Sequence, residues 1–115
     1  MYGVGPPVGP TSGGKIYAYN NIGTTPQVVI AQANPSRTKI TFHNPGTVDI
    51  FVVSQYFQTT GSNVANGATT SALGGCLRIF ANGGQITIEG ECQGQWNAFS
   101  ASASNNPLTV IDSNV

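Results

Sequence analysis

The sequence predicts an all-β protein, an antiparallel β-sandwich of about eight strands with an extended N-terminal arm. Two observations predict it: short runs rich in Val, Ile, Thr and aromatic residues recur along the chain, and clusters of Gly, Pro and Asn separate them. No stretch shows helical periodicity with a cap. Because 115 residues suffice for one domain, we expect an arm over residues 1–14 and a single sandwich domain over residues 15–115.

The first fourteen residues contain five Gly and three Pro, a composition that suits neither a helix nor the interior of a sheet. Proline keeps such a segment extended, and apolar side chains give it contacts for a neighbouring subunit. A disordered tail is an equally weighted alternative. The predicted contact residues of the arm are Tyr2, Val4, Pro6, Pro7 and Val8.

The strand-like runs alternate with turn sequences along the rest of the chain. In one of them Ile40 and Phe42 point to one face while Lys39, Thr41 and His43 point to the other, so one face belongs to the core. The predicted strands are residues 15–19, 27–31, 37–43, 49–57, 77–80, 85–89, 95–100 and 108–112.

The segment 49–57 differs because apolar side chains lie on both of its faces. We expect cover on both sides, either from the second sheet and a loop or from another subunit. Phe51, Val53 and Phe57 are therefore further contact candidates. The long segment 59–75 is dominated by Thr, Ser, Asn, Ala and Gly, and it predicts either a loop that docks on a partner or a flexible excursion.

Asn82-Gly83 supplies the two positive-φ positions of a type I′ turn, which predicts a hairpin of the strands on either side. Its register pairs Ile79 with Ile86 and Leu77 with Ile88, and places Arg78 opposite Thr87 and diagonal to Glu89. The same register puts Cys76 opposite Glu89, away from Cys92. Free buried thiols are therefore favoured over a disulfide, and the spacing fits no zinc site.

Charged residues are scarce: four Lys plus Arg and four Asp plus Glu make 7% of the chain, against about 25% in an ordinary soluble domain. This argues against nucleic acid and anionic membranes as partners, and no apolar stretch is long enough to span a bilayer. No secretory signal is visible, so we expect synthesis in the cytoplasm. A neutral surface favours association over a free monomer, although uncharged polar residues could also keep a small domain soluble. We expect the charges on polar faces and strand ends.

No residue set predicts an active site. The phosphate-loop-like segment 9–15 lacks the following Ser or Thr and the flanking strand and helix. His43 lies on a polar face between Thr41 and a turn, which favours a surface or interface histidine over a catalytic base. Glu89 and Glu91 are typical of a solvated edge. Trp96 is interpreted as a core or interface anchor, with stacking on a sugar as the alternative. We expect no enzyme, no cofactor and no metal.

Two segments carry recognisable motifs: NPSRTKITFHNPG at residues 34–46, and GGQITIEG, GQWNAFSA and PLTVID within residues 77–112. The first is similar to the N-P-x-R-x-x-I-x-F-x-N strand of small β-rich virion proteins of tailed bacteriophages, and residues 77–112 resemble the second half of those proteins. The resemblance implies a jelly-roll-like sandwich that decorates or cements the outside of a phage capsid. It covers neither the arm nor the long loop.

The predicted function is therefore that of a structural virion protein, made in the host cytoplasm, that binds without catalysis. Its expected partners are the major capsid protein or another virion protein, together with other copies of itself as a dimer or trimer. A carbohydrate-binding or receptor-binding module of a fibre or tail accessory is the alternative.

Overall fold

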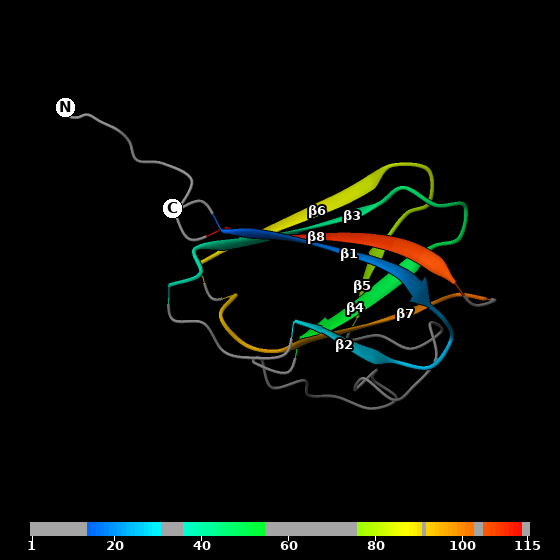
Figure 1. Ribbon diagram of the computed structural model, residues 1–115, viewed down its shortest axis with the longest axis horizontal. Coiled ribbons are helices and arrows are strands. Elements are labelled where there is room, and N and C mark those ends of the chain that lie inside the picture. The colour runs from blue at the N-terminus through cyan, green and yellow to red at the C-terminus, as the bar shows by residue number, and fades with distance from the viewer. Residues whose placement is uncertain (1–13, 31–35, 55–75, 91, 103–104, 114–115) are drawn as a thin grey trace.

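The structure is a computed structural model that describes residues 14–30, 36–54, 76–90, 92–102 and 105–113. Within these residues the chain forms strands and turns but no helix, as the sequence predicts (Figure 1). All eight predicted strands are confirmed. They are β1 (Lys15–Ile22), β2 (Gln27–Ile30), β3 (Lys39–Asn44), β4 (Ile50–Ser54), β5 (Leu77–Ile79), β6 (Gly84–Glu89), β7 (Trp96–Ser100) and β8 (Asn106–Ser113).

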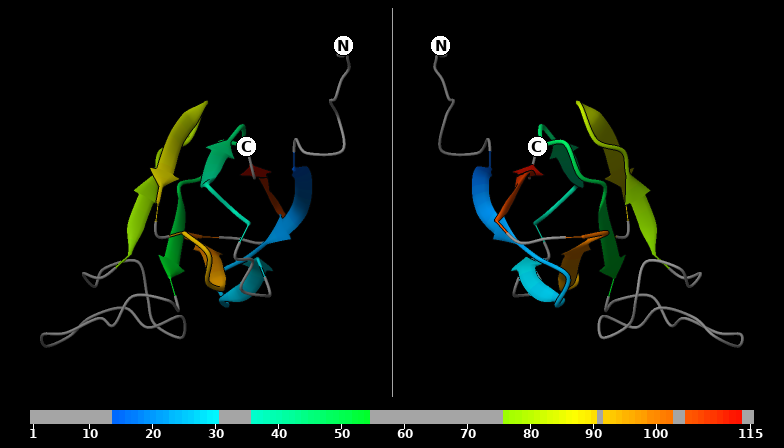
Figure 2. Two further views of the ribbon diagram at one scale, coloured as in Figure 1. Left: turned by 90° about the vertical axis from the view of Figure 1, so that its left-hand side faces the viewer. Right: turned by 90° about the vertical axis from the view of Figure 1, so that its right-hand side faces the viewer.

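The strands form two four-stranded antiparallel sheets that pack face to face (Figures 1 and 2). One sheet has the order β1-β8-β3-β6 and the other has the order β2-β7-β4-β5. The pairing is nested, because the first strand lies beside the last, the second beside the seventh, the third beside the sixth and the fourth beside the fifth. Two edge strands therefore lie at each side of the sandwich: β1 and β2 at one side, β5 and β6 at the other (Figure 2).

The core fills the space between the two sheets, and the alternation along β3 shows how the sequence builds it. Ile40 and Phe42 are fully buried, while Lys39 is exposed and Thr41 is half-buried on the opposite face. Phe42 meets Trp96 of the facing sheet with ring centroids 5.2 Å apart and planes tilted by 57°. Such a tilted aromatic contact adds to the gain from burying both rings.

The strand β4 is buried on both faces, as predicted. Ile50 and Val52 belong to the core between the sheets, and Phe51 and Val53 belong to a smaller cluster on the outer face. In that cluster Phe51 stacks on Phe99 of β7 at 5.5 Å between centroids and 18° between planes. A single chain therefore buries the outer face of this strand.

The positive φ angles predicted for the turn at Asn82 and Gly83 are confirmed, but the predicted pairing of the two flanking strands is wrong. Asn82 and Gly83 do have positive φ angles, 65° and 101°. However, β5 pairs with β4 in one sheet and β6 pairs with β3 in the other. The Asn82 and Gly83 amides donate to the carbonyls of Gly46 and Asn44, both at 2.7 Å, so the turn is held by the β3–β4 connection.

The physical reason is burial. In a hairpin, Ile79 and Ile86 would cover only each other, whereas on opposite sheets both face the core, and Ile79 becomes fully buried. The ion pair changes accordingly, because Arg78 meets Asp49 of the β4 side rather than Glu89.

Candidate interaction surface

The exposed large hydrophobic side chains of the described chain gather at the edges of the two sheets. They are Ile16 on β1 (71% exposed), Val28 on β2 (44%), Leu77 on β5 (42%) and Phe80 directly after β5 (60%). The central strands β8, β3, β7 and β4 carry none in the described residues. Apolar surface that remains exposed in patches is typical of interaction sites.

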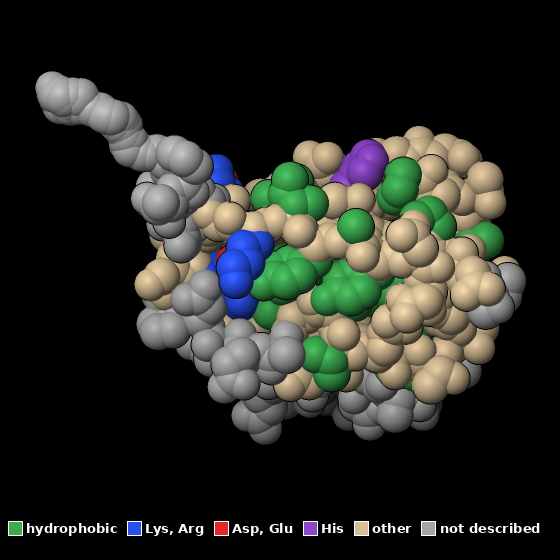
Figure 3. Space-filling view, in the orientation of Figure 1, with side chains coloured by type: hydrophobic (Ala, Val, Ile, Leu, Met, Phe, Trp, Pro, Cys, Tyr) green, Lys and Arg blue, Asp and Glu red, His purple; other side chains and the backbone are tan. Residues whose placement is uncertain are grey.

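The first side, which we call the β1/β2 edge, combines Ile16 and Val28 with the half-buried Tyr17 and Tyr19. The Tyr19 hydroxyl donates to the carbonyl of Val29 at 2.5 Å and so ties β1 to β2 across the two sheets. Burial and the nearby Tyr17 raise the pKa of Tyr19 above 10.0. Figure 3 looks onto this edge: hydrophobic side chains lie along its middle, and Lys and Arg side chains lie at one end.

The second side, which we call the β5/β6 edge, combines Leu77 and Phe80 with the half-buried Ile86 and Ile88. Here the backbone amide of Gly84 donates to the carbonyl of Phe80 at 3.0 Å. The two edges therefore have the same composition, two exposed and two half-buried apolar or aromatic side chains each. They lie on opposite sides of the sandwich (Figure 2).

Arg78 is held beside Phe80 by the carboxylate of Asp49. Arg78 donates from Nε to Asp49 Oδ2 at 2.9 Å and also from Nη2, while the backbone amide of Ala81 donates to Oδ1 at 2.7 Å. The Ala81 amide and the Arg78 guanidinium hold the pKa of Asp49 below its usual 3.8. The pair neutralises both charges at the surface.

The exposed Arg78 and Phe80 lie next to a buried pair of aromatic rings. The Arg78 guanidinium lies 4.7 Å from the centre of the Phe80 ring and 5.9 Å from that of Phe51, which in turn stacks on Phe99. Cation–π contacts of this kind hold an arginine side chain in place while it remains exposed to solvent. Arginine and aromatic side chains are the types that dominate protein interfaces energetically.

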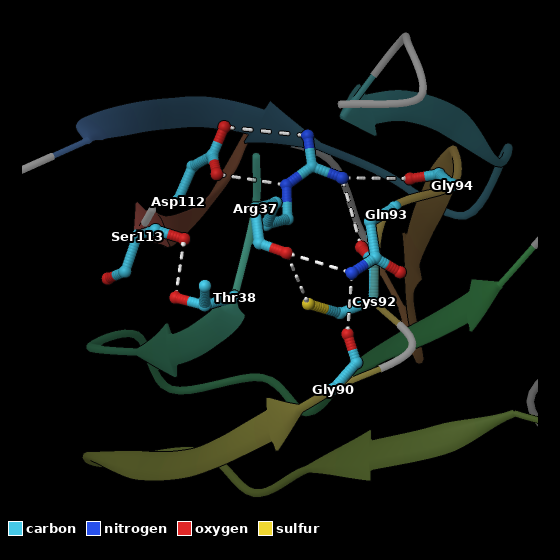
Figure 4. A network of polar contacts seen from close by, with 8 residues as sticks. All are labelled: Arg37, Thr38, Gly90, Cys92, Gln93, Gly94, Asp112 and Ser113. Carbon is cyan, nitrogen blue, oxygen red and sulfur yellow. Dashed lines mark hydrogen bonds and ion pairs between the residues drawn. The ribbon is translucent and has the colours of Figure 1, made fainter. Parts of the chain in front are cut away.

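The main polar network lies inside the sandwich, around Arg37 (Figure 4). Arg37 donates from Nε to Asp112 Oδ1 at 2.9 Å and from Nη2 to Oδ2 at 3.4 Å. Its Nη1 donates to the carbonyls of Cys92 at 3.0 Å and Gly94 at 3.2 Å. The two charges lie at strand ends, as expected, but both side chains are buried and do not occupy a polar face.

The same network fastens the ends of four strands to one another. The carbonyl of Arg37 accepts a bond from the Gln93 side chain at 2.9 Å, and Gln93 also donates to Gly90 at 2.8 Å. The Thr38 amide donates to the Ser113 carbonyl at 2.8 Å. The carboxylate of Asp112 binds Arg37 and its side chain is only 8% exposed, so we assign this cluster a structural role.

The predicted contact residues fall into two groups. Phe51 and Val53 are buried, so a partner that approaches β4 meets the exposed Arg78 and Phe80 first. Phe57, the loop 59–75 and the arm residues before Gly14 lie outside the described residues, as do the arm candidates Tyr2, Val4, Pro6, Pro7 and Val8.

Trp96 is a core residue, because it is 2% exposed and packs on Phe42. The alternative in which its ring stacks on a sugar is therefore wrong. Its indole Nε1 is buried and has no hydrogen-bond partner among the residues that the structure describes.

The other polar candidates do not form a constellation. His43 lies half-buried on β3 with its Nδ1 unpartnered, while Glu89 is exposed at the end of β6. Cys92 is buried and Cys76 half-buried, and neither forms a disulfide, as expected. Burial raises the pKa of each thiol above 9.0. Glu91 lies outside the described residues, and a strand rather than a helix follows the phosphate-loop-like segment.

The described residues hold no group of three His, Cys, Asp or Glu side chains placed to bind a metal ion. The same part of the chain contains no helix that is long and apolar enough to cross a membrane. Comparison of the chain with known protein families, with curated proteins and with solved structures gives no match.

The exposure of four side chains at sheet edges could not be predicted from the sequence, namely Ile16, Val28, Leu77 and Phe80. Alternation shows which face of a strand a side chain occupies, but it does not show whether the strand lies at an edge. For Leu77 and Phe80, the predicted hairpin also assigned the wrong neighbouring strand, since β5 pairs with β4 and not with β6. Ile16 did carry a signal, since the K-I-Y-A-Y alternation places it on the face opposite that of Tyr17 and Tyr19.

Proposed function

We propose that the protein is a non-catalytic structural protein of a bacteriophage virion that decorates or cements the outer surface of the capsid. Its partners are the major capsid protein or another virion protein, and other copies of itself. The observation that carries the proposal is the placement of all the exposed large hydrophobic side chains of the described residues at the two lateral edges. A weakly charged sandwich with apolar edges can bind a lattice of subunits through many modest contacts.

The strand order also supports this proposal. We infer that the sandwich is a jelly roll, because the nested orders β1-β8-β3-β6 and β2-β7-β4-β5 are those obtained when a long antiparallel ribbon is rolled up. The sequence resemblance to phage virion proteins covers residues 34–46 and 77–112, which include β3 and β5 to β8. The resemblance is independent of the edge surface, and it supports the same class of protein as the strand order does.

Cosedimentation with purified phage shells that lack accessory proteins tests the proposal. We expect saturable binding of the chain and fewer bound copies for Phe80→Asp, because the charge replaces an exposed ring at the β5/β6 edge. Thr109→Asp, which adds the same charge on the central strand β8, is the matched control and should bind normally. Absence of binding by the unaltered chain to any shell tested would contradict the function, while loss of binding in the control alone would move the site to the sheet face.

The second candidate is a carbohydrate-binding or receptor-binding module, and one observation keeps it in view. The Phe80 ring is 60% exposed and lies beside the Arg78–Asp49 pair, an arrangement in which a sugar ring could stack and its hydroxyls could find polar groups. Glycan-array binding that is present in the native chain and lost in Phe80→Ala would favour this module. Absence of glycan binding in the native chain would remove it.

A further inference from the structure

We propose that copies of this chain associate head to tail, with the β5/β6 edge of one copy against the β1/β2 edge of the next, and that the main contact is antiparallel pairing of β6 with β1. This inference deepens the self-association contained in the proposed function, and it depends on no property of the shell.

Both β1 and β6 have one side of their backbone without a neighbouring strand in the described part of the chain. Among the described residues β1 pairs only with β8 and β6 pairs only with β3, so each strand has one edge of amides and carbonyls without a neighbouring strand. β6 is six residues long, β1 keeps a regular register from Lys15 to Tyr19 before it shifts ahead of Ile22, and neither strand contains proline. Natural sheets protect long edges with proline, bulges or charge, so the regular part of β1 and the β6 edge are the stretches open to another strand.

The directions of the two edge strands fit a head-to-tail contact. Each sheet has an even number of strands, and every neighbouring pair is antiparallel. The two edge strands β1 and β6 therefore run in opposite directions. When one copy is placed beside the next without inversion, β6 meets β1 in antiparallel orientation, and the sheet continues its own pattern. Pairing of β1 with β1 would instead require a two-fold axis.

Apolar side chains of the two edges lie in matching rows across the junction. The ladder registers place Ile16, Ile111, Thr41 and Thr87 in one row of the outer face, and Tyr17, Val110, Phe42 and Ile86 in one row of the inner face. Continued into the next copy, the inner row brings Ile86 beside Tyr17. Both are half-buried and pack against the core, which ends at each edge, so the junction would bury both.

Opposite charges stand at the two edges and at the same end of the sheet, because Lys15 begins β1 and Glu89 ends β6. Both are exposed, and neither forms an ion pair among the described residues, although Lys39 lies opposite Glu89 on β3. The ladder registers place Lys15 in the row of Ile88 on the inner face and Glu89 one row further on the outer face. The head-to-tail junction therefore brings the two opposite charges to the same end of the contact without pairing them side by side.

Disulfide trapping tests this arrangement, because the two positions to be joined are far apart within one chain. Ile16 and Thr87 occupy the same row but are separated by two strands, which is about 14 Å. A disulfide requires Cα atoms closer than about 7 Å, so no bond can form within a copy. We would place Ile16→Cys on one preparation and Thr87→Cys on another, both in a Cys76→Ser background, and oxidise them separately and mixed.

We expect covalent dimers as the main product of the mixture and little dimer from either preparation alone. Ile16→Cys mixed with Gln85→Cys, which is offset by one row of the same face, is the matched control and should give much less product. The double variant Ile16→Cys with Thr87→Cys should form a ladder of covalent oligomers, which ends at a closed ring if the rotation between copies closes and continues as an open filament if it does not.

Dimers from Ile16→Cys alone, or from Thr87→Cys alone, would overturn the inference in favour of a two-fold contact. A native chain that remains monomeric by light scattering up to its solubility limit, with no dimer from the mixture, would also overturn it. These measurements use the purified chain without shells. Their failure is therefore distinct from a failure of shell binding, which is measured by cosedimentation.

Discussion

Arg37 and Asp112 stand 75 residues apart in the sequence and form a buried ion pair, with Arg37 Nε 2.9 Å from Asp112 Oδ1. Arg37 precedes β3 and Asp112 lies in β8, so the pair joins two neighbouring strands at the end of their ladder. Removal of one charge from such a pair leaves the other buried without compensation.

We therefore expect Arg37→Met to lower the free energy of unfolding by about 3–5 kcal/mol, measured by urea denaturation. The double variant Arg37→Met with Asp112→Leu should recover part of this loss, because it removes the stranded carboxylate. The recovery stays incomplete, since the Cys92 and Gly94 carbonyls also lose their donor. Equal stability of the single and double variants would show that the stranded charge is not the cause.

Gly14 is required where the chain enters β1. Its φ angle is 103°, and a Cβ atom there would lie 1.8 Å from the Asp112 carbonyl oxygen. Gly83 has nearly the same φ, 101°, but a Cβ there meets open space. We expect Gly83→Ala to cost about 1 kcal/mol, the price of the left-handed conformation, and Gly14→Ala to cost clearly more. Similar denaturant midpoints for the two variants would mean that the chain around Gly14 relaxes freely.

Asp49 should contribute to stability in a defined pH range. Its pKa is lowered in the folded state, first by the Ala81 amide and then by Arg78, so its contribution is complete above the ordinary value of 3.8 and is lost as the pH falls through the lower folded value. Thermal unfolding measured from neutral to acid pH should show a smaller acid decrease for Asp49→Asn. Arg78→Gln leaves the Ala81 bond intact and should retain most of the decrease. A native acid profile in Asp49→Asn would contradict this assignment.

Trp96 is the single tryptophan of the chain, and its burial makes its fluorescence a probe of the core. We expect Trp96→Ala to cost about 3–5 kcal/mol, because the contact with Phe42 is replaced by a cavity. Trp96→Phe keeps an aromatic ring and removes a buried indole N–H that has no partner, so its cost should be smaller. Circular dichroism during urea denaturation measures both variants. Equal losses in the two would mean that the size of the indole, not its aromatic contact, holds the site.

The strands could be predicted because their signals are local. Alternation assigned the buried face of β3 correctly, and two-sided apolarity predicted the double burial of β4. The pairing could not be predicted, since the Asn82-Gly83 turn is equally compatible with strands that separate into two sheets. Local turn chemistry fixes where the chain reverses, and the core decides which neighbour each strand takes.

The buried Arg37–Asp112 pair escaped prediction for a similar reason. Arg37 and Asp112 have no local pattern that links them, and only the β3–β8 register brings them together. The edge surface likewise depends on the strand order, which places Ile16 and Leu77 on strands with a single partner. Long-range pairing is therefore the information that the residue pattern lacks.

The nested strand order also sets a condition on the timing of folding. β1 pairs with β8, and β2 pairs with β7, so the earliest strands to be synthesised wait for the latest. The sheet of β1 cannot be completed until β8 has left the ribosome, and the sheet of β2 cannot be completed until β7 has. Because loops of this length must close before their contacts form, the chain should fold slowly.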